Sequence, residues 1–152
     1  MIKGMFKKFP EVHQINFSDC GPSCLMMICK YYGKSISRNY LLQNMPMHKQ
    51  GTSLFDMVNL AEQIGFKAVA AKLTLDEIKS NELCPLIVSW NQNHFVVVYK
   101  VTKTKVYVSD PAHGLISYTY NEFYKYWLSV NDPESDKQGI VFALEPTIEF
   151  YK

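Results

Sequence analysis

The hydrophobic pattern of this chain changes near residue 65. Before that residue, apolar side chains recur at the three- and four-residue spacing of helices, and after it they form short, strand-sized runs. The pattern predicts helices over residues 20–32, 38–44, 54–64, 75–80 and 122–128. It predicts strands over residues 67–72, 86–90, 94–101, 105–109, 115–120 and 140–144. Helices followed mainly by strands indicate an α+β fold with an antiparallel sheet.

Capping residues support the expected helix ends. Gly33 and Gly65 follow the first and third helices, where glycine commonly ends a helix. Ser53 precedes the third helix and Asp56 stands three positions later, which is the spacing of a capping box. Thr74 precedes the short helix at 75–80. These signals agree with the periodicity.

Length and composition indicate one domain with its own core. The chain has 152 residues, of which 47% are hydrophobic. We expect a single folded domain over residues 1–146. Residues 147–152 carry no pattern of their own, and we expect them to start a connection to further domains. The formal charge of +2 is too balanced to indicate a nucleic-acid partner. No apolar run is long enough for a membrane span, and the N-terminus lacks the apolar core of a signal peptide.

The most informative residue is Cys20, which stands at the expected start of the first helix. Unpaired amides and the helix dipole favour a thiolate there, and Asp19 is placed to cap the helix with its carboxylate. Gln14, on the preceding loop, offers a side-chain amide that could donate to an oxyanion beside the Cys20 backbone amide. The alternative is a buried structural cysteine, and taken alone a Cys-Gly-Pro sequence favours that alternative.

A thiol nucleophile needs a base and a group that orients the base, and the second half of the chain supplies both. His94 opens one expected strand and Asp110 closes the next, across a short turn. Antiparallel strands joined in this way place the start of one beside the end of the other, so the two side chains are expected to be neighbours. A half-buried histidine satisfied by a turn aspartate is the alternative, and the presence of Cys20 favours the catalytic interpretation.

The remaining histidines are weaker candidates for the base. His113 lies in a turn, where contact with solvent or the substrate rim is expected. His13 belongs to the loop that leads into the first helix, and His48 lies in a polar connection rich in methionine. His94 is therefore the expected base.

The sequence indicates no cofactor. Its cysteines lack the paired CxxC spacing of a zinc site, and Cys24, Cys29 and Cys84 are expected to be small core residues. No GxxxxGK[ST] or GxGxxG motif occurs, so this chain is not expected to bind ATP through a P-loop.

Together, these motifs resemble the papain-like double-glycine leader peptidases that form the N-terminal domain of bacteriocin-processing ABC transporters. The resemblance runs from about residue 14 to residue 146, with the segments in the family's order. The matching segments are Gln14, Asp19-Cys20-Gly21-Pro22-Ser23-Cys24-Leu25, Tyr31-Tyr32-Gly33, Gly51-Thr52-Ser53-Leu54, His94-Phe95-Val96-Val97-Val98 and Asp110-Pro111-Ala112.

The resemblance implies a papain-like fold in which a helical N-terminal half and an antiparallel C-terminal sheet meet at the active site. It implies that Cys20 is the nucleophile, His94 the base, Asp110 the orienting residue and Gln14 the oxyanion donor. The implied reaction is cleavage of a precursor peptide after a Gly-Gly or Gly-Ala pair. The implied partners are an amphipathic leader and the transmembrane and ATPase domains of an ABC transporter, with the peptidase in the cytoplasm at the inner face of the membrane.

Two functions of other classes stay open. The same residues suit a papain-like amidase or cell-wall peptide hydrolase, because a fold does not determine a substrate. A non-catalytic leader-binding module is the other, and the intact set of four catalytic positions disfavours it. The sequence leaves the precursor, the leader-groove residues, the oligomeric state and the nature of the product, bacteriocin or signalling peptide, undecided.

Overall fold

The computed structural model describes residues 8–15, 19–45, 53–90, 94–128 and 137–152. Its helices are α1 (Cys20–Tyr31), α2 (Arg38–Gln43), α3 (Leu54–Ile64), α4 (Leu75–Ser80), α5 (Tyr120–Trp127) and the 3₁₀ turn η2 (Ile148–Tyr151). Its strands are β1 (Phe66–Leu73), β2 (Leu86–Trp90), β3 (His94–Val101), β4 (Lys105–Asp110), β5 (Gly114–Thr119) and β6 (Gly139–Pro146). Every helix and strand predicted from the pattern is present, with ends that differ by at most two residues. His48 lies outside the described residues.

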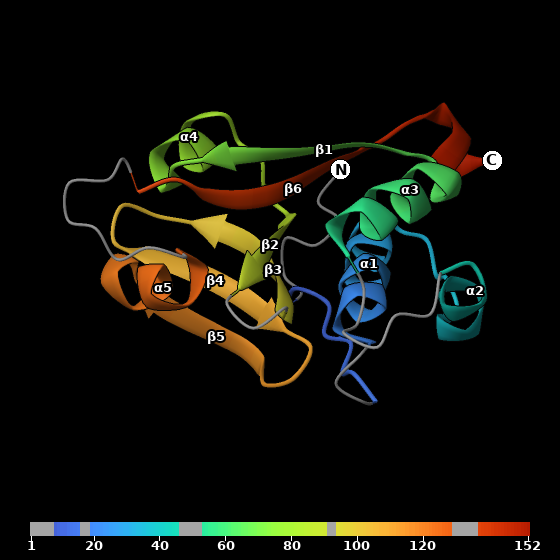
Figure 1. Ribbon diagram of the computed structural model, residues 1–152, viewed down its shortest axis with the longest axis horizontal. Helices are drawn as coiled ribbons and strands as arrows, with labels where there is room; N and C mark the ends of the chain where they lie inside the picture. The colour runs from blue at the N-terminus through green and yellow to red at the C-terminus, as the bar shows by residue number, and fades with distance from the viewer. Residues whose placement is uncertain (1–7, 16–18, 46–52, 91–93, 129–136) are drawn as a thin grey trace.

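The six strands form one antiparallel sheet in the order β1-β6-β2-β3-β4-β5. The predicted α+β class is therefore confirmed. The last strand, β6, lies between β1 and β2, so the C-terminal segment joins the two parts of the sheet (Figure 1). β2 and β3 pair as far as Trp90 opposite His94, and β4 and β5 pair as far as Asp110 opposite Gly114. The turn ends of the β2–β3 and β4–β5 pairs therefore lie along the same edge of the sheet, where these strands end.

Successive residues of the central strands belong to two separate hydrophobic cores, one on each face of the sheet. Ile87 and Val97 face α1 and α3, whereas their neighbours Val88 and Val96 belong to the core under α4 and α5. Figure 1 shows α1 and α3 together on one side, with α5 on the other side over β4 and β5. The central strands β2 and β3 are covered on both faces, which explains their nearly continuous apolar runs.

Local capping explains where the helices begin and end. Ser53 accepts a hydrogen bond from the Asp56 amide at 3.1 Å, which is one of the two bonds of the expected capping box. Thr119 and Glu122 form a capping box, so α5 begins two residues earlier than the apolar pattern indicated. Gly65 ends α3 with a φ of 118°, and a Cβ there would lie 2.4 Å from the Phe150 backbone nitrogen. Only glycine meets both requirements.

The final residues pack against the same domain. Phe150 of η2 is fully buried, and the Thr147 hydroxyl donates to the Gly65 carbonyl at 2.6 Å. The start of a connection to further domains at residue 147 stays a prediction. Within the described ranges, no helix combines the length and apolarity needed to cross a membrane. The same ranges contain no group of three His, Cys, Asp or Glu side chains arranged to hold a metal ion.

Candidate active site

Cys20 is the first residue of α1 and is buried, with 3% of its surface exposed. The first amides of a helix have no acceptor within the helix, and the dipole is positive at that end. α1 packs against β3, whose first residue is His94. The predicted start of this helix at Cys20 is confirmed, and the packing brings the helix N-terminus to the edge of the sheet where the hairpins end.

The predicted proximity of His94 and Asp110 is confirmed. His94 Nε2 lies 2.8 Å from Asp110 Oδ1, and the exposed fractions of the two side chains are 23% and 2%. Because Asp110 takes Nε2, the other ring nitrogen, Nδ1, is left for the hydrogen bond with Cys20. The three side chains therefore form a chain from thiol to imidazole to carboxylate, the arrangement used by thiol peptidases.

The electrostatics of Cys20, His94 and Asp110 favour a charged His94 imidazole. Burial acts to lower the pKa of His94, but hydrogen bonds to Asp110 and Cys20, together with their charges, raise it from 6.5 to about 9. Burial likewise acts to raise the pKa of Asp110, and the bonds from His94, the Ala112 amide and His113 lower it below its ordinary value. At neutral pH the site holds an imidazolium between a carboxylate and the sulfur of Cys20.

A short turn after β4 holds the Asp110 carboxylate in place. The Ala112 amide donates to Asp110 Oδ1 at 2.8 Å, and His113 Nδ1 lies 3.2 Å from Oδ2. Gly114 closes the turn with a φ of 87°, a conformation suited to glycine. The His113 contact was not predicted from the sequence, where only solvent or substrate contact was expected. Its side chain is nevertheless 70% exposed, so the solvent prediction holds as well.

Gln14 is held beside this turn through its backbone. Its amide donates to the Pro111 carbonyl at 2.9 Å. The next residue, Ile15, donates to the Asp19 carboxylate, which directly precedes Cys20. Gln14 thus lies between the segment that carries Cys20 and the turn after Asp110. Its role as an oxyanion donor stays a prediction.

The predicted capping role of Asp19 is wrong. Asp19 occupies the N-cap position of α1, but its side chain makes no capping hydrogen bond. Its ψ of 23° departs from the extended backbone of typical N-caps, and its carboxylate is engaged elsewhere. It accepts from the Ile15 amide at 3.1 and 3.2 Å and from Arg38 Nη1 at 2.8 Å. A charged donor from α2 competes better for a buried carboxylate than neutral amides do.

The other cysteines have structural surroundings. Burial raises the pKa of Cys29 and Cys84 to about 12. Burial also raises the pKa of Cys24 well above its ordinary value, and the nearby Cys20 and Asp110 add to that shift. These three thiols stay protonated at neutral pH, as expected for core residues.

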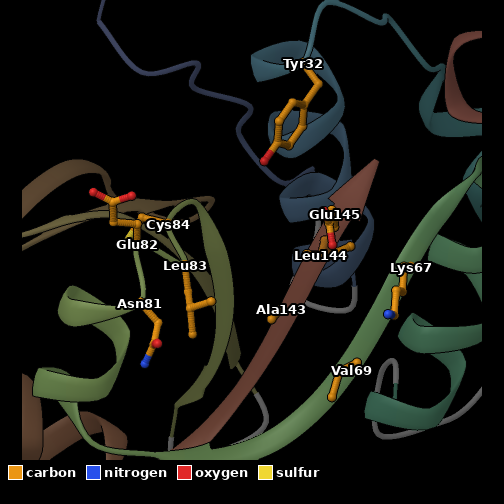
Figure 2. A pocket seen from close by; sticks show the side chains of 10 residues that line it. All are labelled: Tyr32, Lys67, Val69, Asn81, Glu82, Leu83, Cys84, Ala143, Leu144 and Glu145. Atoms are coloured by element: carbon orange, nitrogen blue, oxygen red, sulfur yellow. The ribbon is translucent and has the colours of Figure 1, made fainter. Parts of the chain in front are cut away.

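A surface cavity of about 460 Å³ lies away from these residues (Figure 2). It is bordered by β1, β6 and the α4–β2 connection, and Tyr32 projects toward it from the end of α1 opposite Cys20. Its lining residues are Tyr32, Lys67, Val69, Asn81, Glu82, Leu83, Cys84, Ala143, Leu144 and Glu145. α1 is 12 residues long, about 18 Å, so this cavity is separate from the candidate catalytic residues.

The family model of Peptidase C39 matches residues 8–132, a range that contains all four candidate catalytic positions. The chain belongs to the peptidase C39 family. It is 33% identical over 124 residues to the colicin V secretion/processing ATP-binding protein CvaB of Escherichia coli, covering 82% of this chain. It is 36% identical over 125 residues to the lactococcin-G-processing and transport ATP-binding protein LagD of Lactococcus lactis subsp. lactis, covering 78% of this chain. It spans only 18% of the length of each relative.

The fold of this C39 domain also matches a solved relative. A double glycine motif protease from an AMS/PCAT transporter, solved in complex with the leader peptide, superposes with a TM-score of 0.79 at 25% identity. The match covers 92% of this chain and 93% of that one. The family and the papain-like fold implied by the resemblance are thereby confirmed.

Proposed function

We propose that this chain is a cysteine endopeptidase that removes the leader from a ribosomally made precursor peptide by cleaving after a Gly-Gly or Gly-Ala pair. The observation that carries the proposal is the His94 imidazole, hydrogen-bonded to Asp110 through Nε2 and to Cys20 through the other nitrogen. This order of contacts supports a thiolate–imidazolium pair oriented by a carboxylate. Membership of a peptidase family and two relatives named for processing and transport support the same reaction.

The site residues can complete both halves of a peptide hydrolysis. The Cys20 sulfur attacks the carbonyl carbon of the second glycine, and the resulting oxyanion accepts hydrogen bonds from the Gln14 side-chain amide and the Cys20 backbone amide. His94 then gives its proton to the leaving amine as the C–N bond breaks, which leaves a thioester. In the second half, His94 removes a proton from water, and the hydroxide hydrolyses the thioester and restores the thiolate.

A Gly-Gly pair offers no side chain to recognise, so selectivity requires exclusion of larger residues and contacts further upstream. The solved relative is a complex with the leader peptide, which supports contacts with the leader as the upstream determinant. The two relatives named above are ATP-binding proteins of which this chain matches 18%. We therefore propose transmembrane and ATPase domains of an ABC transporter as partners and the inner face of the cell membrane as the location.

The test uses the 152-residue chain and a panel of synthetic peptides, each with an amphipathic leader ending in Gly-Gly or Gly-Ala, with products identified by mass spectrometry. We expect a single cut directly after the glycine pair. Replacing either glycine with leucine should stop cleavage, and Cys20→Ala should abolish it without loss of folding. Cleavage elsewhere in the peptide, or activity in Cys20→Ala, would contradict the proposal. Hydrolysis of cell-wall peptides in place of leaders would favour the amidase alternative.

A further inference from the structure

The backbone on both sides of Gln14 is fixed by hydrogen bonds from three other parts of the molecule. The His13 carbonyl accepts from Arg38 Nη2 at 2.9 Å, from helix α2. The Gln14 amide donates to the Pro111 carbonyl at 2.9 Å, in the turn after Asp110. The Ile15 amide donates to the Asp19 carboxylate at 3.1 and 3.2 Å. Three consecutive residues are therefore held from outside their own segment.

Arg38 is the group that joins these contacts. Its Nη1 lies 2.8 Å from Asp19 Oδ2 and 2.8 Å from Ser23 Oγ, while Nη2 binds the His13 carbonyl. The ion pair is largely buried, with exposed fractions of 17% for Arg38 and 3% for Asp19. A planar guanidinium can hold several acceptors in a fixed arrangement, which a single ammonium group cannot reproduce. One side chain thus links the segment before Gln14, the residue before Cys20 and the first turn of α1.

We propose that Arg38 is a positioning residue for the oxyanion hole. By holding His13 and Asp19 at the same time, it sets where the Gln14 side chain lies relative to the Cys20 amide, and it does so without touching the substrate. Oxyanion donors act because they are fixed before the charge develops, so a small displacement weakens catalysis more than binding. The inference rests on the proposed role of Gln14.

The first experiment measures kcat and KM of Arg38→Lys and Arg38→Met on a peptide ending in Gly-Gly followed by a fluorogenic leaving group. Lysine keeps a positive charge beside Asp19 but lacks the planar guanidinium that binds Asp19, Ser23 and His13 together. We therefore expect kcat to fall roughly 10-fold, with KM changed less than about threefold. Arg38→Met should lose roughly 10²-fold in kcat. If Arg38→Met does not fold, Arg38→Lys still decides the question.

A second measurement isolates the oxyanion site. A peptide aldehyde ending in Gly-Gly adds the Cys20 thiol across its C=O bond: the S–C bond forms and the thiol proton passes through His94 to the oxygen. The product places that oxygen where the oxyanion forms, whereas an uncleaved peptide carries no such group. We expect Arg38→Lys to weaken aldehyde binding by roughly the same factor as kcat and to leave binding of the peptide to a Cys20→Ala background unchanged. Equal weakening of both would assign Arg38 a general structural role.

A double-variant cycle separates the positioning role of Arg38 from the proposed oxyanion role of Gln14. If Arg38 acts through Gln14, Arg38→Lys in a Gln14→Ala background should cost less than about threefold in kcat. Full additivity would overturn the positioning role of Arg38. A Gln14→Ala variant with unchanged kcat would instead overturn the proposed role of Gln14, which is a distinguishable result.

Lys34 provides the matched control. It is a partly buried cation whose Nζ donates to the Phe150 carbonyl at 2.7 Å, at the other end of α1. Lys34→Met should lower the thermal midpoint and leave both kcat and aldehyde affinity unchanged. A kcat loss in Lys34→Met equal to that in Arg38→Met would show that any loss of a partly buried cation slows the enzyme, and it would overturn the inference.

Discussion

The two ends of α1 are held in different ways. At the N-terminal end, charged and polar groups meet from distant parts of the chain, such as Arg38 with Asp19 at 2.8 Å and Cys20 with His94. At the C-terminal end, aromatic rings pack together. The ring centroid of Tyr32 lies 6.1 Å from that of Phe66 and 6.4 Å from that of Phe150.

This difference follows from what each end must do. Proton transfer and oxyanion binding need atoms at fixed distances and angles, which hydrogen bonds provide. Stability needs buried apolar area, which is insensitive to direction. Variants at the two ends should therefore separate activity from stability, and the following predictions test that separation in order of decreasing free-energy change.

The largest effect is expected at His94. His94→Ala should lower kcat/KM by at least about 10⁴-fold, because the thiol loses its base and the leaving amine its acid. His113→Ala should stay within about threefold of the parent, since His113 is 70% exposed and contacts the carboxylate oxygen that His94 does not use. Steady-state kinetics on the Gly-Gly peptide provide the measurement. Equal losses in the two variants would require a different base.

At the other end of the helix, Phe150→Ala should act on stability. Phe150 is fully buried, and removal of a core phenylalanine costs about 3–5 kcal/mol of unfolding free energy. Urea denaturation measures this change, and kcat per folded molecule should be unchanged. Ile148→Ala in the same 3₁₀ turn is the control, because Ile148 is 76% exposed and should cost under about 0.5 kcal/mol. A drop in kcat without a drop in stability would contradict the separation.

Gln14→Ala should lower kcat by roughly 10²-fold, about 2.7 kcal/mol, the effect of losing one preorganised oxyanion donor. KM should change far less, because the bond forms chiefly in the transition state. Gln14→Glu should be at least as poor, since a carboxylate repels the developing charge. A rise in KM with kcat spared would make Gln14 a substrate-binding residue instead.

Asp110→Asn should have a smaller effect, roughly 10-fold in kcat. An asparagine oxygen at the position of Oδ1 can still accept from His94 and the Ala112 amide. The charge that helps raise the pKa of His94 is lost, however. A cost as large as that of His94→Ala would show that charge, and not orientation, is the essential contribution of Asp110.

The same variant should change the pH profile. His94 must be protonated to serve the leaving amine, so kcat/KM of the parent should fall as pH rises through about 9, and this limb should move to lower pH in Asp110→Asn. The free energy of unfolding should also fall at high pH. The stabilisation that comes from the raised His94 pKa is fully present below pH 6.5 and is lost as pH rises through about 9. The lowered Asp110 pKa acts oppositely, and its contribution is lost in acid. Kinetics and thermal melts across this range give both profiles, and an unmoved limb would contradict the assignment.

Much of the fold and the candidate catalytic pair could be predicted because the signals are local. Helical and strand periodicity determined the order of elements, since each pattern fits only one backbone repeat. The proximity of His94 and Asp110 followed from a short turn between adjacent antiparallel strands, which places the start of β3 beside the end of β4 even though the register shifts between Val98 and Lys100. The position of Cys20 at a helix start needed only the residues around it.

The contacts of Asp19 could not be predicted in this way. A capping role is the local expectation for an aspartate before a helix, and the distant Arg38 overrides it with a buried, charge-assisted bond. The docking of Phe150 against Gly65 escaped prediction for the same reason, because residues 147–152 show no periodicity of their own.

The sequence by itself therefore determined the helices and strands of this protein, the proximity of His94 and Asp110, and the position of Cys20 at the start of a helix. The tertiary structure alone decided that Pro111 and Arg38 hold the backbone around Gln14 and that Asp19 binds Arg38. The physical reason is that local backbone preferences act over a few residues. A hydrogen bond between distant side chains depends on loop paths and helix packing, which exist only once the whole chain has folded.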